Sequence, residues 1–212
     1  MGNRSKKIRS KLAFRNALLE LLKTNLFDSL TVTLISEKAG YSKQSFYIYY
    51  EDKYDFCDKI IDDEIEMIKG VVQEAIDARG GELKTVEDIR FMRTKVFTHV
   101  YENRDLYYAF FHQPCFSNFI RKFMHYLLEE ERLPIFLFSY KDKEDVDVLY
   151  LNYICSYIHI AHLNYWVEAG FKGSPEKIAE DYSRLMEDLD FVTFEKIGTT
   201  YIKQKKLVDY GI

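Results

Sequence analysis

The sequence predicts an all-α fold, and three observations support that class. Apolar residues recur at the three- and four-residue steps of helical faces along most of the 212-residue chain. Glycine or proline stands where these patterns stop, at Gly40, Gly80-Gly81, Pro114 and Gly170. Hydrophobic residues make up 47% of the chain, which is enough to bury a substantial core. We therefore expect a small three-helix unit in residues 1–53 and a larger helical domain in residues 54–212.

The chain opens on a basic segment that leads into an amphipathic helix. Residues 3–11 contain no acid, and their basic side chains are Arg4, Lys6, Lys7, Arg9 and Lys11. Apolar residues at helical spacing follow from Ile8 to Leu22. Arg4, Lys6 and Lys7 are candidates for an arm that reaches a DNA backbone or minor groove. A solvated, frayed terminus is the alternative.

Two short helices that meet at a glycine are predicted between Leu30 and Lys53. The apolar positions are Val32, Ile35 and Ala39 before Gly40, and Phe46 and Tyr50 after it. Thr31 or Thr33 can cap the first helix, and Ser42 can cap the second. This spacing has the outline of a helix-turn-helix, although an ordinary surface hairpin of two helices has it too.

The second of these helices carries donor-rich side chains on the faces that its apolar positions leave open. They are Lys43, Gln44, Ser45, Tyr47 and Tyr49. Ammonium, amide and hydroxyl groups suit phosphates and the base edges of a major groove. The helix is therefore a candidate for reading DNA.

In order and spacing, this region resembles the DNA-binding signature of the TetR/AcrR family of transcriptional regulators. The matching residues are Thr31-Val32, Ile35, Ala39-Gly40-Tyr41-Ser42-Lys43, Ser45-Phe46-Tyr47, Tyr49-Tyr50 and Lys53. The sequence departs from the family at Ile48, where a cation is frequent, and at Leu34, where a charge is frequent. The resemblance therefore carries no phosphate contact over to Ile48.

The resemblance implies a homodimer whose two recognition helices enter successive major grooves of a palindromic operator. Base edges would be read by Lys43, Gln44 and Ser45. Phosphates would be held by Tyr47, Tyr49 and Lys53, with Thr31 on the same DNA-binding surface. It also implies a repressor that a small-molecule effector releases, with the fourth helix as the lever between the reading head and the effector domain.

Charge is unevenly distributed along the chain. Residues 1–50 hold nine Lys and Arg against three Asp and Glu, whereas the remainder holds 21 against 31. The first segment thus has a net charge of +6 and the rest −10. A positive head can meet phosphate while the acidic body is repelled by DNA.

Further helices are predicted in order through the rest of the chain. A long one runs from Asp52 to about Arg79, and Thr85 with Asp88 then restarts the pattern as an N-cap and an acid three positions on. That helix continues through Ile89 to about Asn103, and the remaining helical segments are Leu106–His112, Phe119–Leu128, Val148 to about Ala169, and a last one after Ser174-Pro175. Leu133–Tyr140 and the basic tail from Gly198 are assigned to no element.

The end of the chain carries a second resemblance. Trp166-Val167-Glu168-Ala169-Gly170 and Ser174-Pro175-Glu176 are similar to the C-terminal half of a TetR subgroup that includes regulators associated with dihydroxyacetone kinase. In that subgroup the last two helices pair with their symmetry mates in a four-helix dimer interface. The helix from Val148 is apolar on more than one side, so more than one side must be covered.

Aromatic residues concentrate between Phe97 and Trp166, where the resemblance implies an effector cavity. Its expected lining is Phe97, Phe111, His112, Tyr126, Tyr157 and His162. Each of these residues could equally be plain core or a dimer contact. His159 with His162, or His112 with Cys115, could supply metal ligands, but we expect no metal and no cofactor.

No motif for catalysis is present, because the chain has neither a glycine-rich phosphate loop nor a Gly-x-Ser-x-Gly elbow. Cys57, Cys115 and Cys155 are odd in number and widely spaced, so we expect no disulfide framework. The same cysteine pattern fits a reducing cytoplasm, and no apolar run approaches 18 residues, so we expect no membrane span and no membrane partner. Two alternatives to the regulator stay open: an enzyme or small-molecule binder on a helical scaffold, and a TetR-like interaction module without ligand-regulated release of DNA.

Overall fold

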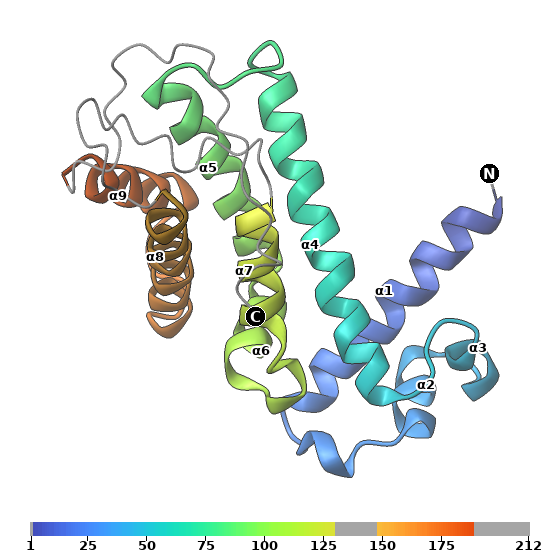
Figure 1. Cartoon of the computed structure of the whole chain (residues 1–212). Coiled ribbons are helices and arrows are strands. Elements are labelled where there is room, and N and C mark those ends of the chain that lie inside the picture. The colour runs from blue at the N-terminus through green and yellow to red at the C-terminus, as the bar shows by residue number, and fades with distance from the viewer. Residues whose placement is uncertain (1, 130–147, 189–212) are drawn as a thin grey trace.

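The computed structural model describes residues 2–129 and 148–188, and every regular element in these ranges is helical (Figure 1). The all-α prediction is confirmed for this part of the chain. The elements are α1 Gly2–Leu22, η1 Phe27–Ser29, α2 Val32–Ala39, α3 Lys43–Tyr47, α4 Lys53–Asp77, α5 Val86–Glu102, α6 Arg104–His112, η2 Pro114–Phe116, α7 Phe119–Glu129, α8 Val148–Glu168 and α9 Pro175–Asp188. The unassigned segments of the sequence, Leu133–Tyr140 and the tail from Gly198, lie outside the described residues.

The basic segment at the start of the chain is helical, which differs from the predicted arm. Helix α1 begins at Gly2, so Arg4, Lys6 and Lys7 lie in its first turns. Lysine and arginine are good helix formers, and neither proline nor glycine interrupts residues 3–22. Figure 1 shows the N-terminal half of α1 projecting away from α4.

Helices α1 to α3 form a small head around one aromatic cluster. The rings of Phe14 and Phe46 are 5.4 Å apart, and those of Tyr50 and Phe56 are 4.5 Å apart. Phe14, Phe46 and Phe56 are fully buried. Because Phe56 lies in the first turn of α4, the head core includes a residue beyond the expected boundary at residue 53.

Local caps set the positions of α2 and α3. The Thr31 hydroxyl accepts a 3.1 Å hydrogen bond from the Leu34 amide, which selects Thr31 over Thr33 as the N-cap. Gly40 ends α2 with φ of 74°, a left-handed conformation that costs glycine little. Ser42 then caps α3 by accepting from the Ser45 amide at 3.2 Å. The turn between the helices is therefore fixed by three local interactions.

The long helix α4 runs from the head into the trunk (Figure 1). Asp52 caps it by accepting hydrogen bonds from the amides of Tyr54 and Asp55. Its 25 residues bury one face from end to end. The other predicted cap, Thr85 with Asp88, forms a complete capping box at the start of α5.

The trunk surrounds α4 and α5 with the remaining helices. Helix α5 packs against α4 and α9, while α8 packs against α6 and α7. Trp166 and Tyr182 are completely buried and join α8 and α9 to this core. Figure 1 shows α8 and α9 on the side of the trunk away from α4.

Candidate nucleic-acid interface

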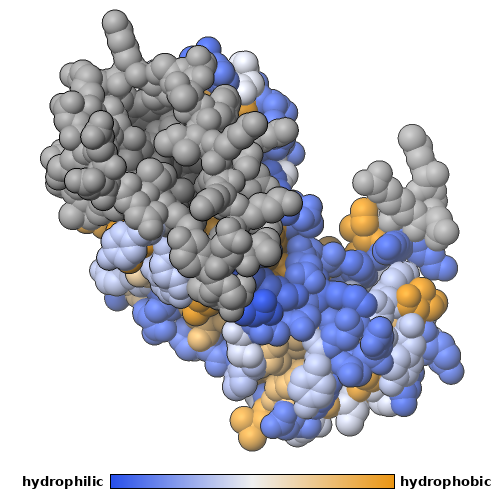
Figure 2. Space-filling model, in the orientation of Figure 1, coloured by the Kyte–Doolittle hydropathy of each residue, from blue (hydrophilic) through white to orange (hydrophobic). Residues whose placement is uncertain are grey.

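Helix α3 turns its apolar side inward and its donors outward. Phe46 is fully buried and Tyr50 nearly so, which anchors the helix to the head. Ser42, Lys43 and Gln44 are exposed, and Tyr47 and Ile48 expose 50% and 72% of their surfaces. The surface over the head is mostly hydrophilic, with apolar residues among the polar ones (Figure 2). The helix thus offers a short polar ridge to a partner.

The predicted base readers differ in how free their side chains are. Lys43 and Gln44 are exposed, and the Lys43 ammonium lies 5.8 Å from the ring centre of Tyr47. Ser45 is half-buried, and its hydroxyl lies 2.9 Å from that of Ser42. Lys43, Gln44 and Tyr47 therefore form the accessible part of the ridge, whereas Ser45 also stabilises the start of α3.

The residues predicted to contact phosphates also differ in how exposed their side chains are. The Thr31 side chain is exposed at the start of α2, where free backbone amides favour an anion. Tyr49 is half-buried and its ring packs 6.0 Å from that of Tyr50. Tyr47 has the most exposed ring of α3. Its ring packs edge-on against that of Phe46, with the two ring centres 5.8 Å apart.

Lys53 is engaged inside the protein. Its ammonium donates three hydrogen bonds of 3.0 Å, to the carbonyl oxygens of Phe27, Asp28 and Leu30. The same ammonium lies 4.7 Å from the centre of the Phe27 ring. An ammonium has three donors, and all three are occupied here. We therefore leave Lys53 out of the phosphate contacts proposed below and assign it to holding the segment before α2.

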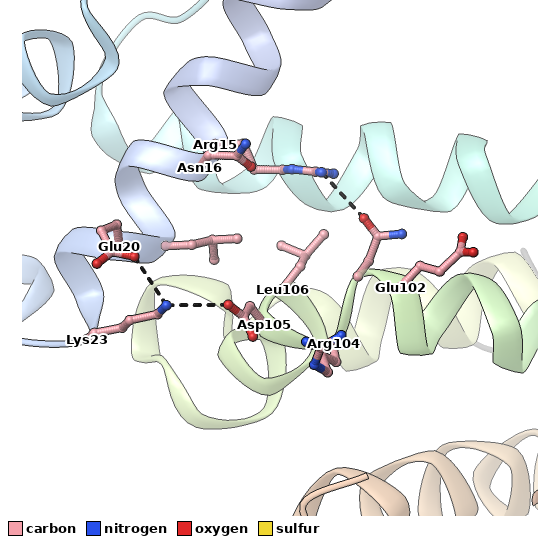
Figure 3. Close-up of a pocket in the computed structure, with 10 residues that line it drawn as sticks. Arg15, Asn16, Glu20, Lys23, Glu102, Arg104, Asp105 and Leu106 are labelled. Carbon is pink, nitrogen blue, oxygen red and sulfur yellow. Dashed lines mark hydrogen bonds and ion pairs between the residues drawn. The ribbon is translucent and has the colours of Figure 1, made fainter. Parts of the chain in front are cut away.

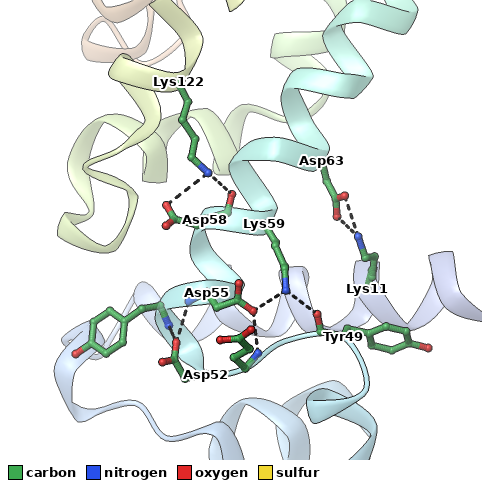
Figure 4. Close-up of polar contacts among 10 residues, drawn as sticks. Lys11, Tyr49, Asp52, Asp55, Asp58, Lys59, Asp63 and Lys122 are labelled. Atoms are coloured by element: carbon green, nitrogen blue, oxygen red, sulfur yellow. Dashed lines mark hydrogen bonds and ion pairs between the residues drawn. The ribbon is translucent and has the colours of Figure 1, made fainter. Parts of the chain in front are cut away.

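A polar belt fixes the loop between α3 and α4 (Figure 4). Lys59 on α4 donates to the Tyr49 carbonyl at 3.2 Å and to the Asp55 carboxylate at 2.7 Å. Burial disfavours the charged form of Asp55, but its hydrogen bonds with Lys59 and with the Glu51 amide outweigh burial and lower its pKa. These contacts therefore fix the orientation of α3 relative to α4.

Ion pairs tie the same stretch of α4 to its neighbours, and Figure 4 draws those of Lys122 with Asp58 and of Lys11 with Asp63. Lys122 on α7 lies 2.8 Å from an oxygen of Asp62, and it also donates to the Asp58 carbonyl at 3.2 Å. On the other side, Lys11 of α1 contacts Asp63 at 2.6 Å. The lower part of α4 is thus held between the head and the trunk.

A buried carboxylate joins helices at the boundary of head and trunk. Glu64 of α4 is 2% exposed and accepts a 2.9 Å hydrogen bond from the hydroxyl of Tyr107 on α6. The same oxygen lies 2.7 Å from Nε2 of His99 on α5. Arg15 of α1 approaches the second carboxylate oxygen at 3.8 Å. Burial, followed by the Glu64 charge, raises the pKa of Tyr107 well above its usual value.

A hollow of about 280 Å³ lies beside this cluster, between α1 and the turn from α5 to α6 (Figure 3). Its lining alternates in charge: Arg15, Lys23 and Arg104 against Glu20, Glu102 and Asp105. Lys23 spans it, 3.2 Å from Glu20 and 3.4 Å from Asp105. These contacts make a polar seam between head and trunk. None of the residues predicted to line an effector cavity lies in it.

Two of the predicted effector residues lie together. The ring of Phe97 on α5 is 5.7 Å from that of His162 on α8 and also 5.7 Å from Trp166. Both predicted residues belong to the packed centre of the trunk. They face Tyr182 of α9, whose ring lies 4.7 Å from His162.

The other four residues lie in separate places. Phe111 packs on Phe119 at 5.5 Å. His112 is exposed at the end of α6, 3.1 Å from the Glu168 carboxylate. Tyr126 is buried on α7, and Tyr157 is 44% exposed on α8. Among the described residues, the six side chains therefore do not share one wall.

Two histidines of α8 are held in a cationic, buried environment. His159 and His162 face Tyr182, over whose ring the guanidinium of Arg93 lies at 4.7 Å. Burial lowers the pKa of both histidines, and the charge of Arg93 adds to the effect. Within residues 2–129 and 148–188, no three His, Cys, Asp or Glu side chains gather closely enough to hold a metal ion.

Comparison with known proteins relates this chain to transcriptional regulators. Residues 87–188 match a TetR family model described as a transcriptional regulator C-terminal region. The HTH-type transcriptional regulator YxbF of Bacillus subtilis (strain 168) is 26% identical over 184 residues, which are 84% of this chain and 44% of that protein. Residues 87–188 are thus similar to the C-terminal region of TetR-type transcriptional regulators, and the chain as a whole is similar to an HTH-type regulator. It spans less than half the length of that curated relative.

Solved structures share the fold of this chain at low identity. The dihydroxyacetone kinase operon activator DhaS is 18% identical with a TM-score of 0.54, over 85% of this chain and 95% of that one. FadR of Bacillus subtilis, solved with stearoyl-CoA, is 15% identical with a TM-score of 0.60, over 82% and 96%. FadR of Thermus thermophilus, solved with lauroyl-CoA, is 17% identical with a TM-score of 0.52, over 91% and 99%.

The matched family and relative are transcriptional regulators rather than enzymes, in agreement with the lack of a catalytic motif. No helix among the described residues of this chain is long and apolar enough to cross a membrane. Its three cysteines are free thiols.

Sequence reasoning missed the residues that connect head and trunk. Glu64, His99 and Lys59 make their contacts with partners 10 to 43 positions away. One signal was present: Glu64 stands among Ile60, Ile61, Ile65 and Ile68, on the apolar face of its helix. An acid on such a face needs a buried partner.

Proposed function

We propose that this chain is a homodimeric repressor that binds a palindromic operator in duplex DNA through α3 and is released by a small-molecule effector. It would act in the cytoplasm, where chromosomal DNA is accessible. The observation that carries the proposal is the exposed polar ridge of α3 on a head of net positive charge.

Each side chain of the ridge has a role that suits its placement. Lys43 and Gln44 are exposed at the start of α3 and would reach base edges in the major groove, with Ser45 behind them. Tyr47, Tyr49 and Thr31 would contact phosphates around them. The aromatic cluster under Phe46 and the belt through Lys59 would hold this ridge rigid.

The proposed dimer uses α8 and α9. Four tyrosines expose between 38% and 69% of their surfaces along α8, namely Tyr150, Tyr153, Tyr157 and Tyr165, and Leu185 exposes 42% on α9. Helix α8 already buries its other side against α6 and α7. A second copy would cover the tyrosines and set the distance between two α3 helices.

The proposed effector would bind the trunk and change the angle of α4. An effector shifts the equilibrium only by its difference in affinity between the two dimer geometries. The cluster around Glu64 contacts α1, α4, α5 and α6, so a change in trunk packing would reach the head through it. Stearoyl-CoA and lauroyl-CoA are the first compounds to test, because two regulators of this fold were solved with them.

A gel-shift titration tests the proposal directly. Duplex DNA flanking the gene of this protein is titrated with the purified chain at stated salt, alongside Gln44→Ala and Tyr47→Ala. Loss of a phosphate contact should weaken binding to every sequence alike, whereas loss of a base contact should relax discrimination at particular bases. Binding by both variants that equals the parent's would refute these contacts.

A further inference from the structure

Ile48 is an exposed apolar side chain at the C-terminal end of the polar ridge of α3, the ridge formed by Lys43, Gln44 and Tyr47. It exposes 72% of its surface and follows directly on Tyr47 as the C-cap of α3. Its backbone stays helical, with φ of −66° and ψ of −28°. Because residues four apart share a helix face, Ile48 lies on the same side as Gln44.

The position of Ile48 is fixed from both sides. Phe46 and Tyr50 are buried in the aromatic cluster of the head, and Ile48 stands between them. The Tyr50 amide donates to the Phe46 carbonyl at 3.1 Å, which closes the turn around Ile48. A β-branched side chain also has few rotamers on a helix. Ile48 is therefore a rigid apolar point on a polar surface.

Ile48 can form neither a hydrogen bond nor an ion pair with a phosphate, because an isoleucine side chain carries no donor and no charge. Among the base edges of the major groove, the apolar group is the 5-methyl of thymine. We propose that Ile48 reads thymine through its 5-methyl group, at a base pair next to the one that Gln44 reads. This inference rests on the proposed function and adds a residue that determines specificity.

Selection from a random duplex pool tests the assignment. The full chain and Ile48→Ala are each used to enrich binding sites at the same salt concentration, with circular dichroism to verify that the exposed substitution leaves the fold intact. The parent should enrich thymine at one position in each half-site, and Ile48→Ala should leave that position degenerate. If both proteins enriched the same thymine, the role of Ile48 would be refuted, but the proposed DNA binding would not.

Replacing that thymine by uracil isolates the methyl group, because the hydrogen-bonding edge stays the same. The parent should bind the uracil duplex about fourfold more weakly for each half-site, the amount expected for exposing one methyl group. Ile48→Ala should bind both duplexes equally, and Gln44→Ala, as the matched control, should keep the parent's uracil sensitivity. Equal binding of the two duplexes by the parent overturns the inference. Failure of the parent to enrich any duplex would instead refute the proposed function itself, and this inference with it.

Discussion

Tyr107 donates a 2.9 Å hydrogen bond to the carboxylate of Glu64, and both side chains are almost completely buried. The bond joins α6 to α4, and His99 adds a contact to the same oxygen from α5. A charge at 2% exposure is tolerated only with such partners. The pair therefore marks where the trunk is locked to the helix that carries the head.

Removal of the Glu64 carboxylate should destabilise the fold. Glu64→Ala leaves the buried groups of Tyr107 and His99 without their shared acceptor, so the free energy of unfolding should drop by about 3 kcal/mol. Urea denaturation measures it. The matched control is Glu66→Ala on the same helix, whose side chain is 70% exposed and which should change stability by less than about 0.5 kcal/mol. Equal effects of the two variants would mean that the buried cluster contributes nothing.

Lys53 and Lys43 should respond differently to loss of their charge. Lys53→Met removes the three hydrogen bonds to the carbonyls before α2, so stability should fall by about 1–3 kcal/mol. Its DNA affinity should keep the parent's salt dependence. Lys43→Met should leave stability unchanged, weaken DNA binding and relax discrimination at the base pair that Lys43 reads. A salt slope reduced by about one unit in Lys53→Met would show that Lys53 neutralises a phosphate after all.

Acid should weaken the trunk before the carboxylates titrate. Burial holds the pKa of His159 and His162 below 6.5, so below pH 6.5 the unfolded chain binds more protons than the folded one. Stability is thus complete well above pH 6.5 and falls as the pH is lowered, by about 1 kcal/mol between pH 6.5 and 5.5 for one strongly shifted histidine. The groups that face them are Arg93, Tyr182 and Asp181.

Melting temperatures at pH 7.5 and 5.5 test this effect. The parent should melt a few degrees lower at pH 5.5, since 1 kcal/mol corresponds to about 2–4 °C for a chain of this size. A His159→Gln, His162→Gln double variant should lose part of that difference. An identical pH dependence in the double variant would assign the effect to other groups.

The tyrosines on α8 should control the oligomeric state. Tyr165 and Tyr157 expose 69% and 44% of their surfaces, and a carboxylate at either position would be buried unpaired in the proposed dimer. Tyr165→Asp and Tyr157→Asp should shift the protein to a monomer in sedimentation velocity runs. Met67→Asp on α4, at a site 55% exposed, serves as the control and should remain dimeric. A parent that sediments as a monomer would contradict the dimer.

Local features of the fold were predictable from the sequence because their causes are local. The caps at Ser42 and Thr85 and the turn at Gly40 depend on residues within four positions, and they lie where expected. The apolar pattern predicts that the first helix starts near Ile8, whereas α1 starts at Gly2, because the basic residues between them also favour a helix.

Features that depend on tertiary contacts could not be predicted in this way. Lys53 fits the family signature, yet its ammonium binds carbonyls 23 to 26 positions away. The six aromatic and histidine residues expected around an effector share a composition but lie on different helix faces. Sequence spacing gives the face of a helix, and only packing decides which faces meet.

DNA binding through α3 is tested by a fluorescence anisotropy titration of a selected duplex with the parent protein over a series of salt concentrations. We expect saturable binding with two chains on each duplex and an affinity that falls steeply with salt, by about 0.9 log units per phosphate contacted for each log unit of salt. If the protein bound no duplex at low ionic strength, α3 would not be a DNA-reading helix.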